Sequence, residues 1–309
     1  MTQKPLLSPG EVWERRKFVL ALTKAAGAGL FLSAPFISQA NSFINSRSWT
    51  VGEIMDLFIK QIPTAPFAAT VDTLKSGSRD MQVKGIVTTM FATVDVIKKA
   101  IAAGANFIIA HEPTFYNHQD QTDWLKDDDV YRSKVDLLQK NNIAVWRNHD
   151  YMHSVKPDGV QSTLIARLGW QNYQDKEKPN RINIPAISLK TLIGHAKKSL
   201  QIPTVRYIGD LTQSCKKILL MPGASGGRSH IIGIGKEQPD VLIVGEIQEW
   251  ETAEYVRDAN SEGKKLSLIV LGHIASEESG SAYMASWIKQ NVSGIAVQHI
   301  PAGNSLSFF

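Results

Sequence analysis

From residue 50 onwards, the apolar positions follow two spacings, one typical of helices and one typical of buried strands. Recurrence every three or four residues predicts helices over 51–62, 94–103, 130–141, 160–168, 189–200, 251–261 and 281–290. Short continuous apolar runs predict strands over 83–90, 107–110, 143–146, 205–208, 217–221, 241–244, 266–271 and 294–300. The two kinds of element follow one another along most of the chain.

This order predicts the fold class. Strands separated by helices of about 10–14 residues are typical of layered α/β proteins whose sheets are at least partly parallel. A charged segment over 175–181, which contains Pro179, indicates a boundary between two lobes. We therefore expect a two-lobed α/β domain over 41–309, with the second lobe over about 183–262. The glycine-rich segment 223–227 follows a predicted strand and is expected to be a turn; it lacks the Lys-Ser/Thr of a phosphate-binding P-loop, although a substrate anion could contact it.

The first 40 residues differ in composition from the rest and are interpreted as a targeting segment. Arg15 and Arg16 precede a stretch rich in Ala and Gly over 25–36, which resembles a twin-arginine export signal. That stretch is shorter than the roughly 20 apolar residues that span a bilayer, so no stable membrane span is expected. Small residues up to Ala40 predict cleavage after that position and a periplasmic protein. An uncleaved signal anchor or an amphipathic N-terminal helix is the alternative.

Charge and cysteine content exclude several classes of protein. The 309 residues carry a net charge of +5, of which +3 lies in residues 1–40, so the remainder is close to neutral. A body this close to neutrality lacks a broad nucleic-acid footprint, and no nucleic-acid partner is expected. The single cysteine, Cys215, excludes an intramolecular disulfide framework and any zinc cluster built on several cysteines.

Three of the eight histidines stand directly after short apolar strands. In open α/β sheets, ligands bind outside the carboxyl ends of the strands, so these segments are expected to meet in one site if the strands are neighbours. Two of the three are followed, four residues later, by a second side chain on the same face of a helical turn. The candidate ligands are His111, Glu112, His149, His153, His273 and Glu277.

Imidazole and carboxylate ligands together indicate Zn, Mn, Fe, Co or Ni rather than Ca or Mg. Five or six such groups exceed the ligands of one open tetrahedral catalytic site. They fit two ions about 3.5–4 Å apart. The other histidines, expected to be ordinary surface or core residues, are His118, His195, His230 and His299.

The order of these segments resembles the GTP cyclohydrolase type 2-like, or Nif-three-like, family of dinuclear metal proteins. The family pattern of His-His-Pro, His-x-x-x-Asp, Gly-Glu-Ile and Gly-His-x-x-x-Glu is matched, over roughly residues 50 to 309, by the segments His111–Pro113, His149–His153, Gly245–Ile247 and Gly272–Glu277. Two positions depart from the pattern, because Glu112 replaces a His and His153 replaces an Asp. The two exchanges leave the total ligand charge unchanged, which suggests a retained centre with altered metal preference; a weak or absent second ion is the alternative.

The resemblance implies roles for these residues. The implied metal ligands are His111, Glu112, His153, His273 and Glu277. His149 matches a family histidine that supports the ligands from behind, and Glu246 matches a family glutamate that is either a proton acceptor or a structural partner. The resemblance also implies two lobes facing each other across a metal-binding cleft, and a ring-shaped homohexamer.

Two functions are compatible with these observations. The first is a hydrolase that uses two divalent ions to cleave a nucleotide-like or phosphorylated small molecule, with GTP cyclohydrolase chemistry suggested by the family name. The second is a metal- or ligand-binding oligomeric scaffold without turnover. Metal content per chain would separate one bound ion from two. The substrate-binding residues are not predicted by the sequence.

Overall fold

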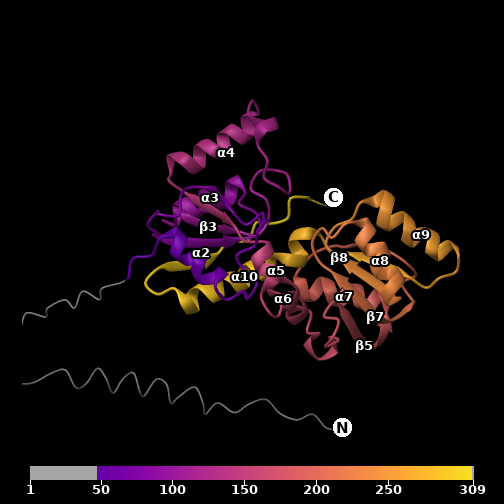
Figure 1. The fold of residues 1–309 in the computed structure, drawn as a ribbon. Helices are drawn as coiled ribbons and strands as arrows, with labels where there is room; N and C mark the ends of the chain where they lie inside the picture. Colours follow the sequence, from indigo (N-terminus) through magenta and orange to yellow (C-terminus); the bar gives the residue numbers. More distant parts are fainter. Residues whose placement is uncertain (1–46, 308–309) are drawn as a thin grey trace, which may run out of the picture. The chain divides into compact units, whose positions relative to one another are not determined.

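The computed structural model describes residues 47–307 (Figure 1). The predicted signal peptide and its cleavage site lie outside the described residues. Between residues 47 and 307, no helix combines the length and the hydropathy needed to cross a membrane. The described chain forms two five-stranded sheets with helices on both faces of each, so the predicted α/β class is confirmed.

The first sheet has the strand order β1-β4-β3-β2-β10. Its strands are β1 (Leu74–Ser76), β2 (Gly85–Thr89), β3 (Phe107–Ala110), β4 (Ala144–Arg147) and β10 (Ala296–His299). Strands β4, β3, β2 and β10 are parallel, and β1 pairs antiparallel with β4 at one edge. The carboxyl ends of β2, β3 and β4 therefore meet at one edge of the sheet.

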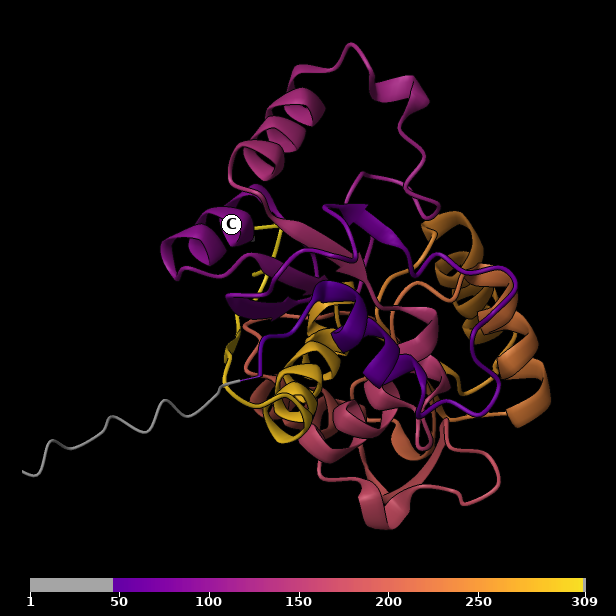
Figure 2. The same ribbon diagram turned by 60° about the vertical axis from the view of Figure 1, so that its left-hand side comes forward.

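Alternate side chains of this sheet enter two separate cores, as the period of two along a strand requires. Phe107 and Trp146 pack with α2 (Val51–Ile59) and α10 (His273–Asn291), which lie on the same face of the sheet in Figure 2. Ile108 and Val145 pack on the other face with α3 (Val94–Ala102) and α4 (Asp129–Lys140). All residues of β2, β3 and β4 are buried, and for this reason the sequences of these strands are short and mostly apolar.

The second sheet has the strand order β5-β7-β8-β9-β6. Its strands are β5 (Arg181–Ser188), β6 (Arg206–Ile208), β7 (Ser214–Met221), β8 (Val241–Val244) and β9 (Ser267–Val270). The central strands β7, β8 and β9 are parallel, with antiparallel β5 and β6 at the edges. The sheet includes β9 and thus extends beyond residue 262, where the second lobe was expected to end.

The helices around the second sheet also form two layers. One core joins the sheet to α6 (Gly159–Arg167) and α7 (Leu189–Leu200). The other joins it to α8 (Gly227–Glu237) and α9 (Glu254–Ser261), which follows a π-helical turn, η3 (Glu249–Ala253). The remaining short elements are η1 (Asp123–Leu125), α5 (Asp150–Ser154) and η2 (Gln171–Tyr173).

Several elements differ from the prediction for physical reasons. Strand β5 was not expected, because it is an edge strand with exposed positions, an internal Pro185 and an irregular register against β7. Helix α8 was not expected, because three glycines within it lower its intrinsic helix propensity. Helix α10 begins at His273, eight residues before the predicted start, since its first turns are rich in Ser and Gly and show no apolar stripe.

Candidate metal centre

The first candidate ligands follow the end of β3. The backbone N–H of His111 donates to the carbonyl of Thr89 at the end of β2 (3.1 Å), and that of Glu112 donates to the carbonyl of Met90 just beyond it (2.9 Å), so both residues remain bound to the sheet. Both side chains are buried. His111 Nδ1 lies 3.1 Å from the carbonyl oxygen of Asn148, which can only accept. The proton of a neutral His111 ring is therefore on Nδ1, and Nε2 carries a lone pair.

The second pair of candidate ligands is presented by α5, which begins just after β4. The buried Asp72 accepts backbone N–H groups from the start of this helix, from His149 (2.8 Å), Asp150 (3.0 Å) and Tyr151 (2.7 Å). A carboxylate at this position satisfies N–H groups that a helix leaves unpaired and complements the helix dipole. Asp72 thus fixes the turn that carries His149 and His153 on one face.

A carboxylate holds each of these two histidines from behind. His149 Nδ1 lies 2.9 Å from Asp150 Oδ1, and His153 Nδ1 lies 3.0 Å from Asp158 Oδ2. Asp150 is itself fixed, because its Oδ2 accepts from Thr70 Oγ1 at 2.7 Å. Metal-binding histidines usually make this contact, which sets the tautomer and aims Nε2 at the ion. Sequence reasoning missed both carboxylates; Asp150 adjoins His149 in the chain, whereas nothing in the spacing marks Asp158.

The last candidate ligands lie in the first turns of α10. His273 and Glu277 are four residues apart, and His273 Nε2 is 3.1 Å from Glu277 Oε2. On the other side of the ring, His273 Nδ1 is 3.2 Å from Glu246 Oε2, which follows β8. Glu246 therefore orients His273, and its side chain is half exposed rather than part of the buried cluster.

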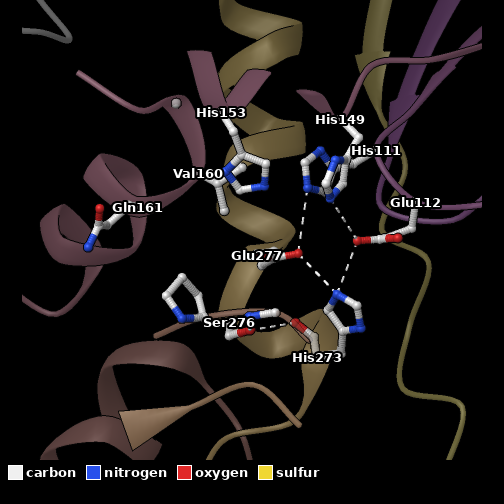
Figure 3. A network of polar contacts seen from close by, with 12 residues as sticks. His111, Glu112, His149, His153, Val160, Gln161, His273, Ser276 and Glu277 are labelled. Carbon is white, nitrogen blue, oxygen red and sulfur yellow. Dashed lines mark hydrogen bonds and ion pairs between the residues drawn. The ribbon is translucent and has the colours of Figure 1, made fainter. Parts of the chain in front are cut away.

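Imidazole nitrogens and carboxylate oxygens alternate around the cluster (Figure 3). Glu277 Oε2 is 3.5 Å from His111 Nε2 and 3.1 Å from His273 Nε2. Glu112 Oε1 is 3.2 Å from His273 Nε2 and 3.8 Å from His149 Nε2. The rings of His111, His149 and His153 stand 4.8–5.1 Å apart. Three sets of three possible ligand atoms lie within 4.8 Å of one another in the described residues. Two are in the cluster, one from His111, His149 and His153 and one from His111, Glu112 and Glu277; the third, from Asp72, His149 and Asp150, lies at the start of α5.

The charges in this cluster shift the pKa values strongly. Burial alone would raise the pKa of Glu112, but the hydrogen bond from His273 and the charges of nearby histidines hold it at about 2. The same balance lowers the pKa of Glu277. Burial would lower the pKa of His273, yet its contacts with Glu112, Glu246 and Glu277 raise it to about 12. Burial and the charge on His111 lower the pKa of His149 to about 4.

These pKa shifts are consistent with a site that could hold a cation. In the metal-free chain, a protonated His273 lies between two ionised carboxylates, Glu112 and Glu277, where its positive charge compensates theirs. Perturbed ionisation of several grouped residues is a common mark of functional sites. The residue types fit transition metals, since imidazole and carboxylate donors suit Zn, Mn, Fe, Co and Ni.

A buried cation supports Glu112 from the side opposite the imidazoles. The wholly buried guanidinium of Arg147 lies 3.5 Å from Glu112 Oε2 and 3.5 Å from Asp120 Oδ2, and it also donates to the carbonyl oxygen of His118. Lys75 completes this network, 3.2 Å from Asp120. Arg147 thus lies in the core as the partner of a candidate ligand.

The structure brings together all six candidate ligands that the sequence named. The other four histidines lie in ordinary positions. His118 is exposed, with its ring 5.9 Å from that of His149; His195 contacts the Leu168 carbonyl, His230 the Thr252 hydroxyl and His299 the Glu278 carboxylate.

The glycine-rich segment after β7 is a turn that abuts the cluster. Gly223 N–H donates to Ser276 Oγ (3.0 Å), and its carbonyl accepts from Glu246 N–H (3.0 Å), so the turn is fastened to α10 and to the end of β8. At its other end, the carboxylate of Glu251 lies against Gly227, at the start of α8. This helix start therefore already faces a negative charge, which disfavours a bound substrate anion there.

The fold and the site together define a two-sheet α/β protein. Its histidine–carboxylate cluster lies at the carboxyl ends of strands from both sheets. The profile of the Duf34/NIF3 (NGG1p interacting factor 3) family matches residues 50–304. The chain therefore belongs to this family, in agreement with the resemblance carried by the four sequence segments.

Curated relatives in two clostridia share about a quarter of the aligned residues with the chain. A protein of Clostridium acetobutylicum named GTP cyclohydrolase 1 type 2 homolog is 27% identical over 215 residues, which cover 66% of this chain and 76% of that protein. A protein of the same name from Clostridium perfringens is 28% identical over 214 residues, covering 66% and 77%.

Solved structures share the fold. A protein related to NIF3 from Bacillus cereus superposes with a TM-score of 0.68 at 16% identity, covering 85% of this chain and 99% of that one. A hypothetical protein from Staphylococcus aureus superposes with a TM-score of 0.66 at 20% identity and the same coverage. At these identities, the likeness is one of fold.

Proposed function

We propose that this protein binds two divalent transition-metal ions and uses them to hydrolyse a nucleotide-like or phosphorylated small molecule. The observation that carries the proposal is the alternation of Glu112 and Glu277 with the imidazoles of His111, His149 and His273. His153 stands beside His111 and His149. The proposed ligands are His111, Glu112, His153, His273 and Glu277. The name shared by the clostridial relatives makes a guanine nucleotide such as GTP the first substrate to test.

The placement of the two glutamates supports a centre for two ions rather than one. Glu277 Oε2 lies between the Nε2 atoms of His111 and His273, and Glu112 Oε1 lies between those of His273 and His149. Each carboxylate thus faces two imidazoles, and the donors are spread over a wider space than a single ion would occupy. One tetrahedral catalytic site would need only about three protein ligands, so this cluster has more donors than a single ion requires.

When bound, such a pair of ions supplies Lewis acidity, which lowers the pKa of water towards neutrality and polarises the scissile group. The chain's own groups hold the ligands in place. Asp158 aims His153, and the Asn148 carbonyl aims His111. Glu246 accepts from His273 Nδ1 and is half exposed, so it is a positioning residue for His273 that can also exchange protons with solvent.

The test is to replace Glu277 by Gln in the full chain and measure bound metal and turnover of GTP and a panel of phosphoesters. We expect loss of at least one ion per chain and of turnover. Glu278→Gln is the matched control, because it removes the neighbouring carboxylate of the same helix, which contacts His299 instead of the cluster. Full turnover by a metal-free Glu277→Gln protein would contradict the proposal.

One observation favours the second candidate function, a metal-binding scaffold without turnover. Six donors around a buried cluster could fill every coordination position and leave none for substrate or water. In that case, the wild-type protein would hold its metal tightly and release it slowly to chelators, yet show no turnover on the same panel.

We also propose that the protein is exported as a folded chain, because of Arg15 and Arg16 and the short Ala/Gly-rich stretch after them. Replacing both arginines by lysine should leave the protein in the cytoplasm, as cell fractionation would show. The family resemblance further suggests a homohexamer, which light scattering of the purified protein would test.

A further inference from the structure

We propose that His149 is a direct metal ligand and completes a site of three histidines with His111 and His153, distinct from a carboxylate-rich site formed by Glu112, His273 and Glu277. This inference rests on the proposed function and deepens it, because it divides the two ions between unlike donor sets.

The first observation in favour of His149 as a ligand is the orientation of its ring. Its Nδ1 lies 2.9 Å from Asp150 Oδ1, and Asp150 is in turn held by Thr70 Oγ1 (2.7 Å) and the N–H of Val71 (3.2 Å). An ionised carboxylate accepts, so His149 Nδ1 donates, and the lone pair of the neutral ring is on Nε2. A histidine whose only task was to support other ligands would turn a nitrogen towards one of their outer atoms; His149 instead turns its Nε2 into the cluster, 3.8 Å from Glu112 Oε1.

The second step is that three rings share this arrangement. Each uses Nδ1 as a donor to an outer acceptor, which is the Asn148 carbonyl for His111, Asp150 for His149 and Asp158 for His153. Each therefore presents Nε2 on the inner side, and ligand atoms from the three residues lie within 4.8 Å of one another. Within residues 47–307, the buried Nε2 of His111 makes no hydrogen bond and has only the 3.5 Å ion-pair contact with Glu277 Oε2. A cation beside it would give this nitrogen a close partner.

The third step concerns the types of donor in the two groups. His153 is a third imidazole beside His111 and His149, whereas Glu112 is a second carboxylate beside His273 and Glu277. The donors therefore fall into one group of imidazoles and one group rich in carboxylates. Three neutral imidazoles with an open position are the ligand set of zinc catalytic sites, whereas carboxylate-rich sets suit harder ions such as Mn²⁺.

The experiment loads the metal-free full chain with Co²⁺ and, separately, with Zn²⁺, and measures ions per chain together with the visible absorption of Co²⁺. The wild type should bind two ions with unequal affinities. His149→Ala should lose the Co²⁺ absorption of the three-histidine site and keep one ion, and added imidazole should restore the second ion by filling the vacated place. Asp150→Asn, which keeps the ring but weakens its support, should lower the affinity of that site by about 10–100-fold.

His118→Ala is the matched control, since His118 is the neighbouring imidazole whose side chain lies outside the cluster; it should bind two ions as the wild type does. His149→Gln serves if the alanine variant does not fold without metal. Two ions bound to the His149 variants with wild-type affinity and absorption would overturn the three-histidine site while leaving the dinuclear proposal intact. A wild-type chain that binds no ion would overturn both.

Discussion

Arg147 Nη2 lies 3.5 Å from Glu112 Oε2, and both side chains are buried. This contact occupies the outer oxygen of the carboxylate and leaves Oε1 facing His273 and His149. The buried guanidinium thus determines which oxygen of Glu112 the cluster receives. The buried carboxylate of Glu112 needs such a nearby positive charge.

Replacing Arg147 by Met should lower both stability and metal affinity. The change leaves Glu112 buried without its cation, which costs about 3–5 kcal/mol in the free energy of unfolding, and it frees the carboxylate to rotate, which should weaken metal binding by about 10–100-fold. Urea denaturation and metal titration measure the two effects. Lys75→Met is the matched control: it breaks the pair with Asp120 one step further out, so its metal affinity should stay near that of the wild type. Equal metal affinities for the wild type and Arg147→Met would contradict the positioning role.

The metal-free protein should be most stable near pH 6.5, because its cluster residues are shifted in opposite directions. The pKa of His149 is lowered from 6.5 to about 4 and that of Glu112 from 4.5 to about 2, so the stability they contribute is lost as the pH falls through these ranges. The pKa of His273 is raised from 6.5 to about 12, so its contribution is complete below 6.5 and declines as the pH rises above that value.

Chemical denaturation of the metal-free chain between pH 4 and pH 9 measures this profile. His273→Gln should flatten the alkaline side, and His149→Gln should flatten the acidic side. A free energy of unfolding that rises steadily from pH 6.5 to pH 9 would show that His273 does not carry the extra proton in the metal-free state.

Metal binding should release about one proton per chain at neutral pH from His273, in addition to any released by other groups. The raised pKa means that His273 is protonated before metal arrives, and a ligand nitrogen must lose that proton. Calorimetric titration with Zn²⁺ in buffers of different ionisation enthalpy counts the protons. His273→Gln should release about one proton fewer; an unchanged count would exclude His273 as a ligand.

The fold was largely readable from sequence because the central strands are buried on both faces. The runs that form β3, β4, β8 and β9 are short and almost wholly apolar, with Arg147 at the end of β4 and Ser267 at the start of β9 as the exceptions. Helix α4 separates β3 from β4, and α9 separates β8 from β9. The edge strands β1 and β5 were not predicted, since an edge strand has a neighbouring strand on one side only and its polar residues break the apolar run. The start of α10 was also not predicted, because its first turns bury Ser276, Gly280 and Ser281 rather than large apolar side chains.

The sequence predicted those residues of the candidate site that directly follow a strand. His111, His149 and His273 each follow a strand, and the topology brings the ends of β3, β4 and β9 to the same cluster. The supporting groups could not be read in this way. Asp72 reaches His149 across 77 positions of sequence and Glu112 reaches His273 across 161, and such contacts depend on how the two sheets and α10 pack. The burial of Arg147 at the end of β4 could not be read from the sequence either, because an arginine is usually exposed.

The turn at Gly223 offers a way to disturb the cluster without changing a ligand. Gly223 has φ = +69°, and a Cβ added there would clash with Oε1 of Glu277. Gly223→Ala should therefore displace the Glu277 carboxylate and weaken metal binding at least tenfold, a loss of about 1.4 kcal/mol. Gly226→Ala is the matched control, because Gly226 also has a positive φ (+83°) but an added Cβ meets no atom within 4 Å. Both variants place a side chain at a positive φ, so both should lose stability in the metal-free state. Only Gly223→Ala should lose metal affinity, and equal affinities in the two variants would show that Glu277 does not bind the ion.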